Sequence, residues 1–191
     1  MKINCLRIGS LPTSHSPGAG LATLELAKIE DLNTTLLATI SRDELLPDTD
    51  LSEFENVIFL KPNFSNRFIS RLILVNKLLL TLTFFVFQKS FSIVHCHSFL
   101  AAPFCLIFSV LMGVRTLYTF HGSDFHSVIN SSLYLRAMLY YEKILFVSQA
   151  DLAHFREILA KKSISKDRLY AVGNGFDLID NFVSICFTFF L

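Results

Sequence analysis

Acidic residues are missing from the middle third of this sequence. From Asn56 to Ser123 there is no Asp or Glu, whereas the same stretch holds six Lys and Arg residues, and nine of the 16 acidic residues fall between Glu25 and Glu55. Charged residues make up only 17% of the chain, below the usual quarter, and apolar types reach 52%. The net charge of +1 therefore hides a basic and apolar centre. That pattern indicates deeply buried elements or a surface that meets something apolar.

The sequence also lacks paired cysteine spacings, a secretory signal and a long flexible linker. Its four cysteines stand at positions 5, 96, 105 and 186, and the opening residues show no charged, apolar and small-residue order. We therefore expect a reducing, cytoplasmic setting. A chain of 191 residues is long enough for one well-buried domain, and one domain is what we expect.

A metal site is suggested at first by the sequence His95-Cys96-His97. Successive residues of a strand point to opposite faces, so only His95 and His97 can share a side. No third ligand follows at a standard spacing, and we therefore expect no metal or other cofactor.

Short apolar runs alternate with helical patterns along most of the chain. Strands are predicted at residues 2–8, 34–40, 57–60, 93–97, 115–119, 144–147 and 169–172, and helices at residues 21–28, 66–89, 104–112, 131–142 and 148–160. This alternation is typical of an α/β fold: a doubly wound, mainly parallel, Rossmann-like sheet with helices on both faces. Ligands of such sheets bind at the carboxyl ends of the strands. The polar residues that follow the predicted strands should therefore converge on one site.

A loop rich in Gly, Ser and Pro follows the first predicted strand and includes Gly18 and Gly20. A glycine loop that leads into a helix N-terminus can bind an anion through backbone N–H groups and the helix dipole. The two glycines can equally make a simple turn, and the local sequence leaves both readings open.

The predicted helix at residues 66–89 is a candidate membrane contact. Its least polar part, residues 72–87, is about 24 Å long against a hydrocarbon core of about 30 Å, and it contains Lys77. A helix that rests on anionic lipid through Arg67, Arg71 and Lys77 fits better than one that spans the bilayer. An ordinary core helix with a solvated basic edge is the alternative. At 100° per residue the basic sector also includes the apolar residues Leu74, Leu78 and Phe85.

Four motifs, in this order, resemble the N-terminal half of a family-4-type glycosyltransferase. They are "PGAG" in the first loop, "SIVHCHSFLAA", "RTLYTFHGSDF", and "ILFVSQADLAHF" leading to "DRLYAVGNGFD". The resemblance covers residues 1–178 and implies the N-terminal, acceptor-side domain of the GT-B architecture, in which two Rossmann-like domains face each other across a cleft.

The resemblance also implies roles for individual residues. His121 matches the histidine that faces the transferred sugar, and Asp124 matches an acidic position near the acceptor hydroxyl. These two are the candidate catalytic residues, although His121 could instead bond the backbone and Asp124 could cap the next turn. The residues expected to contact the donor phosphates or the acceptor are Gly18, Ala19, Gly20, His97, Ser98, Gly122 and Asn174.

The donor-binding domain of such enzymes has no counterpart in this sequence. Residues 179–191 form an apolar tail, which we interpret as the remnant of a truncation or frameshift. We expect a retaining hexosyltransferase that needs another chain to bind its nucleotide sugar and that acts on a glycolipid or polysaccharide acceptor. The alternative is a non-catalytic module that binds an acceptor or a protein at the membrane. We expect no nucleic-acid partner, and a cytoplasmic location with peripheral contact to the inner face of the membrane.

Overall fold

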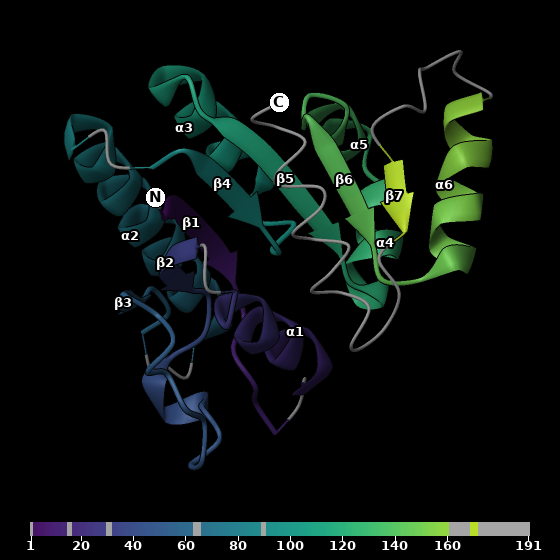
Figure 1. Cartoon of the computed structure of the whole chain (residues 1–191). Helices are drawn as coiled ribbons and strands as arrows, with labels where there is room; N and C mark the ends of the chain where they lie inside the picture. Colours follow the sequence, from purple (N-terminus) through teal and green to yellow (C-terminus); the bar gives the residue numbers. More distant parts are fainter. Residues whose placement is uncertain are drawn as a thin grey trace.

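The fold is built on a parallel sheet. The computed structural model describes residues 2–14, 17–29, 32–62, 66–88, 91–160 and 169–171, and within these ranges seven strands pair in the order β3-β2-β1-β4-β5-β6-β7, every pair parallel. The strands are β1 (Ile3–Gly9), β2 (Leu32–Ala38), β3 (Asn56–Phe59), β4 (Ile93–Cys96), β5 (Arg115–Phe120), β6 (Lys143–Phe146) and β7 (Leu169–Ala171). Figure 1 shows this order across the molecule. The predicted doubly wound α/β sheet is confirmed.

Helices cover both faces of the sheet. The structure describes α1 (Pro17–Ala27), α2 (Arg67–Gln88), α3 (Ala102–Met112), α4 (Gly122–Ile129), α5 (Ser132–Met138) and α6 (Gln149–Ala160), with a short 3-10 turn at Arg42–Glu44. Figure 1 shows α1 on one face and α2 and α3 on the other. The chain thus winds outward from β1 to β3 and then crosses back to β4 on the other side of β1.

The largest part of the core lies between the sheet and the five helices α2 to α6. Every second strand residue contributes to it, because alternate side chains of a strand face the same side. Aromatic rings fill its centre: Phe120 stacks on Phe146 with ring centroids 4.9 Å apart, and Phe155 of α6 lies 5.3 Å from Phe146. Fully burying such a side chain stabilises a fold by about 1.5–3 kcal/mol. These helices therefore hold β5 and β6 in place. Polar residues follow the ends of these strands.

The predicted elements are present but differ in extent; the strand predicted at residues 34–40, for example, lies at Leu32–Ala38. The helix predicted at residues 21–28 begins at Pro17, where the fixed φ of proline suits the first turn of a helix. The helix predicted at residues 131–142 ends at Met138. Residues 122–129, for which no helix was predicted, form α4. The residues after position 171, which include Asn174 and the apolar tail at 179–191, lie outside the described residues.

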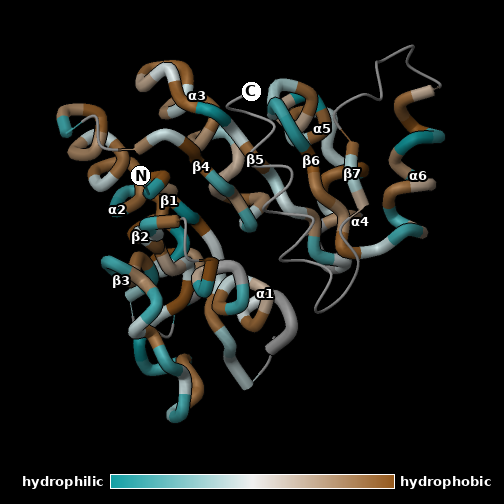
Figure 2. Tube along the Cα trace, viewed as in Figure 1, coloured by the Kyte–Doolittle hydropathy of each residue, from teal (hydrophilic) through white to brown (hydrophobic). Residues whose placement is uncertain are grey.

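The side of α2 that packs against the core is the side that the sequence predicted to face outward. Leu74, Leu78 and Phe85 are buried in the core, so the expectation that they share an outer face with the basic residues is wrong. The exposed face is itself apolar: its most exposed members are Phe68, Leu72, Leu80, Phe84 and Phe87. Figure 2 shows the many hydrophobic residues of α2 in brown. By length and composition alone, Phe68–Gln88 is long and apolar enough to cross a membrane. Of an 18-residue apolar stretch within it, 28% is buried in the domain.

Candidate functional site

The candidate site lies at the carboxyl edge of β1, β4 and β5. These strands are neighbours, since β4 pairs with both β1 and β5. The direction of winding changes between β1 and β4, and in an open α/β sheet this switch point is where ligands bind. Gly9 ends β1, His97 follows β4 and His121 follows β5. Polar residues therefore follow adjacent strand ends at the switch point.

Two histidines contact each other at this edge. The Nδ1 atom of His97 lies 3.0 Å from the Nε2 atom of His121, and the two rings stack with centroids 5.3 Å apart. Both side chains are buried, with exposed fractions of 5% and 9%. The backbone N–H of His97 donates to the carbonyl oxygen of Ile8 at 2.7 Å, which ties the end of β4 to the end of β1.

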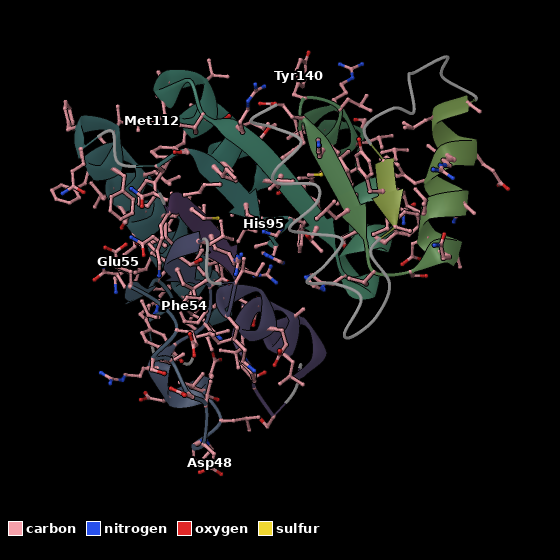
Figure 3. The ribbon with its side chains drawn as sticks, in the orientation of Figure 1. Asp48, Phe54, Glu55, His95, Met112 and Tyr140 are labelled. Atoms are coloured by element: carbon pink, nitrogen blue, oxygen red, sulfur yellow. The ribbon has the colours of Figure 1, made fainter. Side chains whose placement is uncertain are left out.

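A third histidine extends the group into the sheet. The Nε2 atom of His95 lies 2.7 Å from the hydroxyl oxygen of Thr119 on β5, and its ring centroid is 4.0 Å from that of His97. His95 and His97 therefore share a face, as alternation along the strand predicts. Figure 3 shows His95 toward the carboxyl end of β4.

A buried cation stands behind the histidines. Arg7 of β1 is fully buried, and its Nη1 atom donates to the carbonyl oxygen of Thr23 in α1 at 3.3 Å. Its register partner on β4 is His95. The positive charge of Arg7 therefore acts on the histidine group from within the sheet.

All three histidines are held in the neutral form. Burial lowers the pKa of His121 from 6.5 to about 4, because an imidazolium ion loses its hydration there. Burial, with added repulsion from Arg7 and the neighbouring rings, lowers the pKa values of His95 and His97 well below 6.5. At neutral pH the site therefore offers uncharged hydrogen-bonding groups and no cationic imidazole.

The glycine segment lies in the first turn of α1 and not in a loop. Gly18, Ala19 and Gly20 all belong to this helix, because it starts earlier than the sequence suggested. A Cβ atom on Gly20 would lie 2.1 Å from the backbone nitrogen of Pro12. Only glycine permits this approach, which brings the start of α1 against the chain that leaves β1.

The remaining predicted residues lie at the same edge or outside the described part. Ser98 follows His97, and its carbonyl oxygen accepts hydrogen bonds from the backbone N–H groups of Ala101 and Ala102. Gly122 begins α4 and Asp124 lies in its first turn; the side chain of Asp124 is outside the described residues, as is the whole of Asn174.

Three residues of this site were missed in the sequence: Gly9, Arg7 and Thr119. A Cβ atom on Gly9 would lie 2.9 Å from Cβ of His97, so the end of β1 has room for His97 only because residue 9 is glycine. An arginine inside the apolar run "CLRIG" was a signal that could have been used. Thr119 carries no such signal, since threonine is common in strands.

Metal-binding geometry is not found in the described ranges: no group of three or more His, Cys, Asp or Glu side chains there is placed to hold a metal ion. His97 and His121 bond to each other. The cysteines described, Cys5, Cys96 and Cys105, are buried free thiols.

A separate apolar groove opens at the other end of the sheet, between α3 and α5. Its volume is about 950 Å³, and its lining includes Ile107, Val110, Leu133 and Tyr140. Arg115 and Thr116, at the start of β5, also line it. In Figure 3, Tyr140 lies at the top of the view and His95 near its middle; none of the three histidines lines the groove, so it is not part of the histidine site.

Comparison with protein families identifies one match. The model of Glycosyltransferase Family 4 matches residues 24–179, which include the strands and helices from β2 to β7. A search of curated proteins finds no significant match.

Solved structures share the fold at low sequence identity. Arabidopsis thaliana UGT89C1 complexed with quercetin is 13% identical, with a TM-score of 0.59 over 91% of this chain and 50% of that one. Anabaena HepE in complex with UDP and glucose is 16% identical, with a TM-score of 0.56 over 90% of this chain and 44% of that one. The lipopolysaccharide outer core galactosyltransferase WaaB is 11% identical, with a TM-score of 0.55 over 91% of this chain and 46% of that one. The chain thus spans about half the length of these proteins.

Proposed function

The chain belongs to Glycosyltransferase Family 4, and from that membership we propose that it forms the acceptor-side half of a retaining hexosyltransferase. The donor is a nucleotide sugar and the acceptor is a lipid-linked or cell-surface polysaccharide. The observation that supports this most is the neutral histidine pair, His97 and His121, at the switch point of the sheet. A site of this kind can face a second domain across a cleft.

The chemistry that the site offers is hydrogen bonding to developing charge. As the nucleotide leaves, negative charge grows on its phosphate and positive charge on the sugar ring, and preorganised donors or dipoles lower the barrier. His121 supplies such a donor without its own charge, because its pKa is about 4. Asp124, in the first turn of α4, is the proposed acceptor of the hydroxyl proton of the acceptor sugar.

A second domain is part of the proposal. HepE was solved with UDP and glucose, and this chain spans 44% of its length. WaaB is a lipopolysaccharide galactosyltransferase, and this chain spans 46% of its length. These names favour a nucleotide-sugar donor and a glycolipid acceptor. We infer that transfer requires a donor-binding half of similar size, supplied by further sequence or by another chain.

Restoring that half tests the function. The chain is fused to the donor-binding half of another Family 4 enzyme and incubated with labelled UDP-hexoses and a membrane lipid extract. We expect label in the lipid fraction from the fusion and none from either half alone. NMR of the product should show that the anomeric configuration of the donor is retained. An inverted product would contradict the retaining mechanism, and a folded fusion that transfers none of the sugars would contradict the function.

The exposed face of α2 favours a second function, docking on an anionic membrane surface. Exposed Arg71 and Lys77 lie at the two margins of the apolar face, and Arg67 begins the helix. Apolar residues that enter the interface, with bases that meet lipid phosphates, are the usual components of such binding. We propose that this surface keeps the chain at the inner face of the cytoplasmic membrane, near a lipid-linked acceptor.

Vesicle binding tests the docking proposal. Replacing Arg67, Arg71 and Lys77 with Gln should weaken binding to phosphatidylglycerol vesicles on the order of 100-fold at low salt, since each base contributes about 1 kcal/mol. Phe84→Ser with Phe87→Ser should weaken binding to both anionic and neutral vesicles. As a matched control, Arg156→Gln removes an exposed base from α6 and should change nothing. Binding by the triple variant that is unchanged and insensitive to salt would contradict docking.

A further inference from the structure

His97 is held in place from several sides. It is 5% exposed, its backbone N–H bonds Ile8, and its Cβ atom fits against Gly9 with no room for a larger residue there. The ring lies between those of His95 and His121. A side chain fixed this way has one orientation, and its Nδ1 atom points at Nε2 of His121.

The direction of that hydrogen bond follows from the other ring nitrogen of His97. In a pair of neutral imidazoles one nitrogen donates and the other accepts. The Nε2 atom of His97 is buried and has no hydrogen-bond partner among the described residues. If His121 donated, His97 would carry its proton on Nε2 as a buried N–H without a partner, which is the rarer and costlier arrangement. If His97 donates from Nδ1, its Nε2 is a bare lone pair.

The nearby positive charge keeps the ring of His97 neutral. Arg7 is fully buried and repels protons on His95 and His97. A neutral His97 carries one ring proton, and the partnerless Nε2 atom places that proton on Nδ1.

We propose that His97 is a positioning residue: by donating from Nδ1 to Nε2 of His121, it holds His121 in the tautomer that carries its proton on Nδ1. Which ring nitrogen of a histidine is protonated is set by the bond that the other nitrogen makes. The Nδ1–H group of His121 is then the donor that the site presents to the sugar. This last step rests on the proposed glycosyl transfer, whereas the tautomer itself does not.

The tautomer can be measured on the chain as it is. Long-range ¹H–¹⁵N correlation spectra of the ¹⁵N-histidine-labelled chain at pH 7 distinguish the two protonated nitrogens, and His121→Gln assigns the signal. We expect His121 in the Nδ1–H form. In His97→Phe, which keeps a ring against Gly9 but cannot donate, we expect His121 to shift mainly to the Nε2–H form. His97→Asn, whose amide replaces Nδ1, should restore the original form.

Thr119→Val is the matched control. It removes the neighbouring buried hydrogen bond to His95 and leaves the contact between His97 and His121, so the His121 tautomer should not change. A wild-type His121 that carries its proton on Nε2, or an Nδ1–H form that persists in His97→Phe, would overturn the proposal. If His97→Phe does not fold, the wild-type spectrum and the Asn variant still decide it.

Kinetics separate this proposal from the proposed function. In the restored two-domain enzyme, His97→Phe should lower kcat roughly 10-fold to 100-fold, with KM changed less than about threefold, and His97→Asn should recover most of the rate. Wild-type kcat in His97→Phe would refute the positioning role while leaving the function intact. Absence of transfer from the wild-type fusion, with the expected tautomer in the spectra, would refute the function alone.

Discussion

Acidification from pH 7 to pH 5 should lower the free energy of unfolding of this protein by about 2 kcal/mol through His121 alone, and by about 3 kcal/mol below pH 4. The pKa of His121 is about 4 in the folded state and 6.5 in the unfolded state. Between these values the unfolded chain binds a proton that the folded chain does not, so stability falls as the pH falls. His95 and His97, whose pKa values burial also lowers, add to the loss.

Urea unfolding at pH 7, 6 and 5 measures this effect. Carboxylates have usual pKa values of about 4, so histidines dominate the change within this window. His121→Gln should remove about 2 kcal/mol of the difference between pH 7 and pH 5. Arg156→Gln, which alters an exposed residue on α6 that does not titrate in this window, should keep the full difference. A wild-type midpoint that does not move between pH 7 and pH 5 would show that the histidine site is not buried as described.

The sheet could be predicted from the sequence because each strand is a short apolar run with turn residues after it. Strands β4 and β5, for example, were placed to within one residue at their carboxyl ends. That accuracy suffices to put His97 and His121 at one edge, since all parallel strands end there. Family 4 membership was likewise predicted from four motifs and is confirmed by the match over residues 24–179.

The bond between His97 and His121 could not be predicted in this way. It joins residues 24 positions apart and depends on the register that sets Cys96 against Tyr118. A shift of one residue would turn one of the rings to the other face. The neutral state of His97 and of its neighbour His95 depends further on Arg7, which the register of β1 and β4 sets opposite His95.

Helices α2 and α4 show two other limits of the sequence. Apolar residues lie on both sides of α2, so periodicity does not reveal which side faces the core; the buried side is the one that contains Leu74 and Leu78. Helix α4 starts at Gly122, and glycine followed by polar residues is more typical of a loop. Placing Asp124 in a helix therefore required the three-dimensional structure.

The second large effect is expected on catalysis. In the restored two-domain enzyme, His121→Ala should lower kcat by about 100-fold to 1,000-fold, because removing one preorganised hydrogen-bond donor costs that much in comparable sites. Asp124→Ala should lower it by about 100-fold or more, the usual contribution of a positioned general base. Folding of the variants is measured separately, because His121 is buried and bonds to His97, whereas Asp124 lies in the first turn of an eight-residue helix.

The ratio of transfer rates between the wild-type fusion and these variants is the measurement that bears most directly on the site. His154→Ala, on the exposed side of α6, serves as the matched control and should transfer at the wild-type rate. We predict a loss of about 100-fold or more in His121→Ala and in Asp124→Ala, with folding unchanged by circular dichroism. Wild-type transfer rates in both variants would contradict the assignment of His121 and Asp124 to catalysis.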